Sequence, residues 1–200
     1  MDSKEAKAQQ ETAQVVRIVE ELTGLTSRWS GRVELVPDAG FWGKKLFSCA
    51  ILLDAAIAQH PVRWRTLIHE ALHSVSAGHI RADSDTLIGW EEGTVEQLQR
   101  LLRRRVLDAL GVDVAEEVFA ETEAEYPFNP YINALEDVRN VLETPPLDFY
   151  LRLLNTPIAQ RPGSIFGQTM GQSAAARRQI IQVLSRSNAA LKEVVRHGYH

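Results

Sequence analysis

The sequence predicts an α+β fold, in which a small mixed sheet packs on an amphipathic helix and a mostly helical C-terminal part follows. Residues 32–36 alternate between apolar and polar side chains and end at Pro37. Residues 46–53 are almost wholly apolar, which is typical of a strand covered on both faces. From Pro61 onward, apolar residues recur at the spacing of a helix. Together these patterns indicate that the sheet is built partly from residues 32–53.

The other elements follow from the same periodicities. A helix is expected over residues 5–22, where apolar side chains share one face, and a turn over residues 38–43. A helix that starts at Pro61 and carries apolar residues from Trp64 to Val75 is followed by a loop over residues 79–90 and a helix from Glu92 to Leu110, capped by Gly111. Further helices are expected at 113–125, 130–143, 146–154 and 173–197, the last two joined by a loop rich in proline and glycine.

Composition indicates the class of protein. The chain has 200 residues, of which 44% are hydrophobic and 24% charged, so we expect one globular domain over residues 1–200. Within it, residues 1–110 form the sheet, the helix that carries residues 64–75 and the helix from Glu92 to Leu110, and residues 111–200 form a helical subdomain.

The net charge of −4 argues against a nucleic-acid partner. The single cysteine, Cys49, is expected to be buried in a strand and fits a reducing cytoplasm. No apolar run is long enough for a bilayer, so we expect no membrane partner.

One sequence motif indicates a chemical function. Residues 69–73 read His69-Glu70-Ala71-Leu72-His73, an HExxH pattern inside the amphipathic helix. Residues four apart share a helix face, so both imidazoles can reach one metal ion. Glu70 lies beside that ion, where a base for an activated water is needed. With 6 His in the chain, the pattern is expected by chance only about 0.015 times, so coincidence is a poor explanation.

Catalytic zinc usually takes three protein ligands and leaves a fourth position for water, so a third ligand is required. Glu92 follows His73 after 18 intervening residues, at the start of the next helix. His79 is the second candidate, because it completes a spacing of three residues after Ser76. Other carboxylates nearby, Glu91 and Glu96, are further alternatives.

The arrangement resembles the gluzincin zinc peptidases, in which HExxH is followed by a glutamate ligand on a second helix. Many members carry that ligand in an Asn-Glu-Gly pattern, often after a tryptophan. This chain has Trp90, Glu91 in place of the asparagine, Glu92 and Gly93. The resemblance covers roughly residues 46–110 and implies a zincin-like fold, one zinc ion and Glu92 as the third ligand. Glu96, one turn later, would orient a ligand histidine.

A rival pattern resembles the metzincins, in which HExxHxxGxxH supplies a third histidine, here His79. Those enzymes have glycine where this chain has Ser76, because the helix must end there in a turn. Serine in that position would be strained if its φ were positive. We therefore favour Glu92 over His79.

Two tyrosines are candidates for a further proton donor. Gluzincins often use a Tyr or His to stabilise the oxyanion, and Tyr126 and Tyr131 resemble the tyrosines that precede the helix after the ligand helix. The alternative is that both are boundary residues with a buried ring and a solvated hydroxyl. Both interpretations stay open at this point.

The function predicted is zinc-dependent hydrolysis of a peptide bond, with Glu70 as the base and a peptide or protein as substrate. The alternative is a zincin-fold binding or regulatory protein with weak or no turnover. A partner chain that completes the substrate-binding cleft is compatible with either hypothesis.

Overall fold

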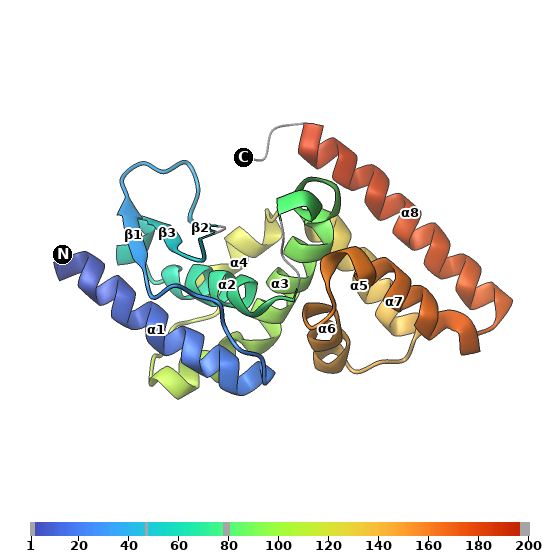
Figure 1. Ribbon diagram of the computed structural model, residues 1–200, viewed down its shortest axis with the longest axis horizontal. Helices are drawn as coiled ribbons and strands as arrows, with labels where there is room; N and C mark the ends of the chain where they lie inside the picture. Colours follow the sequence, from blue (N-terminus) through green and yellow to red (C-terminus); the bar gives the residue numbers. More distant parts are fainter. Residues whose placement is uncertain (1–2, 47, 78–80, 197–200) are drawn as a thin grey trace. The chain divides into compact units, whose positions relative to one another are not determined.

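The computed structural model describes residues 3–46, 48–77 and 81–196 (Figure 1). This part of the chain has an α+β fold, with a small mixed sheet and many helices, as predicted. Contacts divide the chain into two compact units. One contains Met1–Ser76 and Leu98–Glu121, and the other contains Ala77–Gln97 and Thr122–His200. Helix α3 (Arg81–Leu110) contributes residues to both units.

The first unit contains the sheet. Strands β1 (Val33–Val36), β2 (Gly43–Lys45) and β3 (Ile51–Asp54) lie in the order β1-β3-β2 (Figure 1). Strand β1 pairs with β3 in parallel, and β2 pairs with β3 in antiparallel. Strand β2 is therefore an edge strand of the described sheet.

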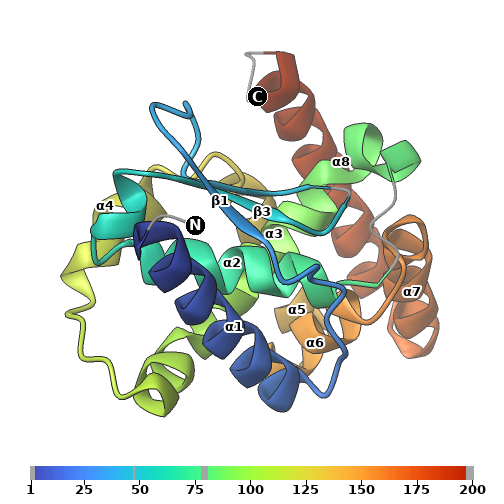
Figure 2. The same ribbon diagram turned by 60° about the vertical axis from the view of Figure 1, so that its left-hand side comes forward.

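Two helices pack beside this sheet. Helix α1 (Ser3–Thr23) lies against α2 (Arg63–Val75) and contacts β1, and α2 contacts β2 (Figure 2). Alternate side chains of β3 are buried, as are apolar residues of both helices, and this burial stabilises the unit by removing apolar surface from water. The fully buried residues of this core include Val15, Val19, Ile51, Leu53, Leu67, Ile68 and Leu72.

Asp54 fixes the loop that leads into β2. Its carboxylate accepts hydrogen bonds from the N–H groups of Ile57, Ala39 and Ala56, at 3.0, 3.1 and 2.8 Å. These bonds stabilise the charged form and lower the pKa of Asp54. The loop before β2 is further held by the Asp54 N–H, which donates to the carbonyl of Trp42 at 3.0 Å.

The first unit also contains the short helix η1 (Ile57–Gln59) and the larger part of α4 (Glu117–Ala124), which continues into the second unit from Thr122. Arg103, on the C-terminal part of α3, forms an ion pair with Glu116 at 2.6 Å, and its guanidinium lies 4.4 Å from the ring centre of Phe119. This contact joins α4 to α3.

The second unit is helical within the described residues. Besides the first part of α3 it contains α5 (Asn129–Val141), α6 (Pro146–Leu154), α7 (Arg161–Gln168) and α8 (Ala174–Arg196), with short helices η2 (Ile158–Gln160) and η3 (Thr169–Gly171). Helix α5 contacts both α6 and α8. Its buried face includes Tyr131, Leu135 and Val138.

The predicted strand over residues 46–53 is too long. Only Ile51–Asp54 forms a strand, because the residues before it turn the chain from β2 into β3. Cys49 has a positive φ of 61° within this turn and is only half-buried, so its expected place in a buried strand is wrong. Strand β2 itself, Gly43–Lys45, falls at the end of the predicted turn and was not expected.

Two predicted loops contain helix. Residues 81–90, from the predicted loop over 79–90, belong to α3, although the backbone at Leu87 is non-helical (φ −122°, ψ 15°). The proline- and glycine-rich stretch after α6 forms η2, α7 and η3. Pro162 stands in the first turn of α7, where a missing N–H costs nothing, and so it starts a helix here rather than breaking one.

One other expectation is confirmed. Helix α3 ends before Gly111, which has a positive φ of 67° and caps it as predicted. None of the helices in the described part of the chain combines the length and apolarity that a bilayer crossing requires.

Candidate metal centre

The two histidines of the HExxH motif converge on helix α2. His69 and His73 lie one turn apart, and both are buried, with 8% and 5% of their surface exposed. Their Nε2 atoms are 3.1 Å apart, and the two rings meet edge to face. Two nitrogens that bind one tetrahedral zinc ion at about 2.0–2.1 Å are about 3.3–3.4 Å apart. The observed 3.1 Å, which is also the length of a hydrogen bond between the two rings, is about 0.2–0.3 Å shorter than the separation that a shared ion requires.

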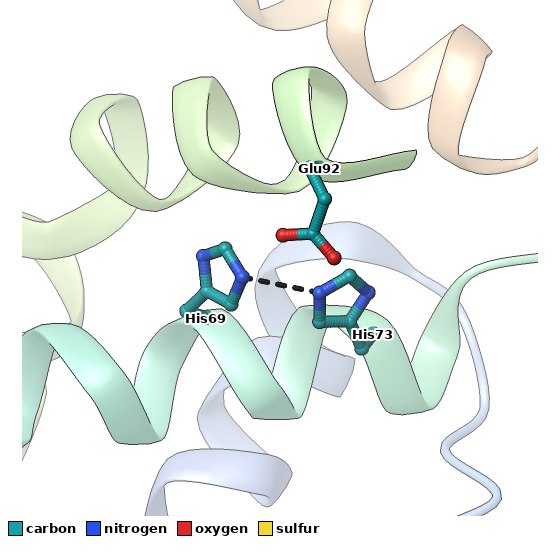
Figure 3. A group of neighbouring side chains, drawn as sticks. All are labelled: His69, His73 and Glu92. Carbon is teal, nitrogen blue, oxygen red and sulfur yellow. Dashed lines mark hydrogen bonds between the residues drawn. The ribbon is translucent and has the colours of Figure 1, made fainter. Parts of the chain in front are cut away.

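Glu92, on helix α3, is the third member of the group (Figure 3). One ligand atom from each of His69, His73 and Glu92 lies within 4.8 Å of the others. Two neutral imidazoles and one carboxylate are a donor set typical of catalytic zinc. The donor set suits zinc, and the ligand atoms are close enough together that the group could hold a metal ion.

Glu70 is held by the edge strand. Its Oε2 accepts a hydrogen bond from the backbone N–H of Lys45 at 2.7 Å, and the residue is 5% exposed. The other oxygen, Oε1, has no hydrogen-bond partner among the described residues. One oxygen is thus fixed in place, and the second remains able to accept a proton.

Gly43 lets strand β2 lie directly on this part of α2. A Cβ atom at Gly43 would lie 2.4 Å from Cγ2 of Thr66 and 3.2 Å from Cγ of Glu70. Only a residue without a side chain fits between the strand and the helix. The glycine therefore determines where the N–H of Lys45 can reach Glu70.

Glu91 forms a buried ion pair with Arg161. It is 1% exposed and forms an ion pair with Arg161 at 2.8 Å, and Arg161 is itself fully buried. Arg161 also donates to the carbonyls of Trp90 and Thr156, at 2.8 and 3.1 Å. Burial lowers the pKa of Arg161, and the charge and hydrogen bond of Glu91 oppose that shift. Glu91 therefore neutralises a buried cation, whereas the group that could hold a metal ion contains Glu92.

The two candidate tyrosines have different surroundings. Tyr126 donates a hydrogen bond from its hydroxyl to Oε2 of Glu92 at 3.0 Å. Tyr131 is 3% exposed, and its ring packs edge to face on Trp90 with the ring centres 5.6 Å apart. Its hydroxyl is buried with no hydrogen-bond partner among the described residues, and burial raises the pKa of the phenol strongly. Tyr126 is thus the tyrosine that contacts a residue of the candidate site.

The rival third ligand, His79, lies outside the described residues. At Ser76 the backbone is extended, with φ −61° and ψ 131°, and α2 ends at Val75. The strain expected for serine at a positive φ therefore does not arise. Glu96 is fully buried, and its role beside a ligand histidine stays a prediction.

Sequence reasoning missed three contributors: the N–H of Lys45, the gap at Gly43 and the ion pair of Arg161. No spacing in the sequence connects Arg161 to Glu91, which precedes it by 70 positions. The only available signal for Gly43 was a glycine before a lysine pair, which is not specific. Backbone groups such as the N–H of Lys45 have no sequence signature.

Comparison of the chain with protein-family models, with curated proteins and with solved structures finds no match. The geometry of the described side chains is therefore what supports a function.

Proposed function

We propose that the protein is a zinc-dependent metallopeptidase of the gluzincin type with a zincin-like fold. The observation that carries the proposal is the group formed by His69, His73 and Glu92, whose ligand atoms lie within 4.8 Å of one another. Glu70 adds a carboxylate one position after the first histidine of the motif. An edge strand beside the HExxH helix fits the same class of fold.

His69, His73 and Glu92 would hold the zinc ion. A zinc ion bound there supplies Lewis acidity, which polarises a carbonyl and lowers the pKa of water at the fourth position. Glu70 accepts the proton of the attacking water on Oε1, since Oε2 is held by Lys45. Glu70 then delivers that proton to the amine that leaves, so the carboxylate returns to its starting state.

Strand β2 is the place where an extended peptide would pair. Among the described residues it pairs with β3 on one side, and its Lys45 N–H points to the base. An extended chain added to a sheet edge gains backbone hydrogen bonds, and pockets for alternate side chains add selectivity. The substrate would thus lie next to Glu70.

The test is Glu70→Gln, with Glu121→Gln as the matched control on an exposed position of α4. Zinc per chain is measured by mass spectrometry, and hydrolysis is measured with fluorescently labelled casein as an unstructured substrate. We expect about one zinc in every variant, and a loss of about 10²–10⁴-fold in rate for Glu70→Gln only, because an amide cannot accept the proton.

Two outcomes contradict the proposal in different ways. Substantial hydrolysis by Glu70→Gln removes Glu70 from the role of base. A wild-type protein that retains zinc and hydrolyses nothing favours the binding or regulatory alternative.

A further inference from the structure

The hydroxyl of Tyr126 lies against the candidate third ligand. It donates to Oε2 of Glu92 at 3.0 Å, and both residues belong to the second compact unit. A hydrogen bond to a charged acceptor is stronger in mutational series than one between two neutral groups. The contact is therefore strong enough to restrict how the carboxylate is oriented.

Tyr126 is itself held in a defined turn between α4 and α5. Its carbonyl accepts a hydrogen bond from the N–H of Asn129 at 3.0 Å. The side-chain amide of Asn129 donates back to the carbonyls of Glu123 and Ala124, at 2.7 and 3.1 Å. The ring also packs beside Phe128, with ring centres 5.7 Å apart. The phenol thus approaches Glu92 from a backbone that is fixed on both sides.

We propose that Tyr126 is a positioning residue for the metal centre: it holds one oxygen of Glu92 so that the other is presented to zinc. This inference rests on the proposed zinc site. Groups that hydrogen-bond a ligand fix its orientation, and their loss typically costs about 10–100-fold in metal affinity. Tyr126 thus acts on the ligand, in place of the role at the oxyanion that the sequence suggested.

Tyr131 provides a matched comparison within the same unit. Its ring packs on Trp90 and would lie 3.3 Å from a Cβ at Gly93, while its hydroxyl makes no hydrogen bond to a described residue. Removing that hydroxyl therefore takes no bond away from Glu92. Tyr131→Phe and Tyr126→Phe each remove one phenolic hydroxyl. Only the hydroxyl of Tyr126 is hydrogen-bonded to Glu92.

The experiment measures zinc affinity by competition with a chelator for the wild type, Tyr126→Phe and Tyr131→Phe. We expect a loss of about 10–100-fold for Tyr126→Phe and no loss for Tyr131→Phe. The visible spectrum of the cobalt-loaded protein should change in Tyr126→Phe only, because the carboxylate ligation changes. Thermal unfolding of the metal-free variants controls for a general loss of structure.

A double-mutant cycle separates positioning from a structural effect. In the Glu92→Ala background, Tyr126→Phe should have no further effect on zinc affinity, because Tyr126 acts through Glu92. Asn129→Ala is a second variant that loosens the turn and keeps both side chains, and a smaller loss of affinity is expected from it.

An unchanged affinity in Tyr126→Phe overturns the inference and leaves the zinc site standing, provided that the wild type binds zinc. An equal loss of zinc affinity in Tyr131→Phe also overturns it. So does a loss caused by Tyr126→Phe in the Glu92→Ala background that is as large as the loss it causes in the wild type. A wild-type protein that binds no zinc refutes the proposed site together with the inference.

Discussion

At the scale of single residues, Gly43 is the position where a change of one methyl group has the clearest consequence. The distance of 2.4 Å between a Cβ at this position and Cγ2 of Thr66 is shorter than real contacts allow. Either β2 moves away from α2, or Thr66 changes its rotamer inside a packed interface. If β2 moves, the N–H of Lys45 loses its fixed distance to Glu70.

We predict that Gly43→Ala lowers the free energy of unfolding by about 1–3 kcal/mol, the usual cost of overpacking. The measurement is chemical denaturation followed by circular dichroism. Gly167→Ala is the control, because no atom lies within 4 Å of a Cβ there and the residue is helical. Combining Gly43→Ala with Thr66→Ser removes the clashing methyl and should restore most of the loss. A fully stable Gly43→Ala would show that β2 does not press on α2.

At the scale of elements, the buried ion pair between Arg161 and Glu91 connects the start of α7 to the part of α3 that carries Glu92. Both side chains are almost completely buried, and Arg161 also satisfies the carbonyls of Trp90 and Thr156. Removal of one partner of such a pair leaves an uncompensated charge in the interior, which costs more than the pair gains.

We predict that Arg161→Met destabilises the protein by about 3–5 kcal/mol, because the charge of Glu91 is left buried without its partner. Adding Glu91→Leu should recover part of the loss, since the charge then disappears, while the two carbonyls stay unsatisfied. Thermal unfolding measures both variants. Arg104→Ala is the control, because Arg104 forms an exposed ion pair with Asp108, worth about 0–1 kcal/mol. Equal stability of Arg161→Met and the wild type would contradict the structural role of the pair.

The elements that the sequence predicted well are those in which apolar residues recur regularly over many positions. Helices α1, α2 and α5 have strong periodicity, and their positions agree with the prediction to within a few residues. Strand β2 could not be predicted, because Gly-Lys-Lys has no strand preference and pairs only through its partner β3. Helix α7 was missed because proline and glycine usually indicate loops, whereas burial of Arg161 and Ile165 favours a helix here.

At the scale of the whole molecule, the candidate site depends on one local motif and one distant residue. His69 and His73 are readable from the sequence, because a helix with four-residue spacing brings their rings together. Glu92 was predicted through a resemblance, and with the two histidines it forms a group that could hold a metal ion. The contacts of Tyr126 and Arg161 depend on the tertiary fold of the second unit, which no short-range pattern encodes.

The most direct test of the central claim is the zinc affinity of Glu92→Ala compared with His79→Ala, measured by competition with a chelator. If Glu92 is the third ligand, Glu92→Ala loses about 10²-fold or more in affinity, because only two imidazoles remain. His79→Ala should keep an affinity close to that of the wild type. If zinc is lost in His79→Ala and kept in Glu92→Ala, the gluzincin-type site is wrong and a site with three histidines takes its place.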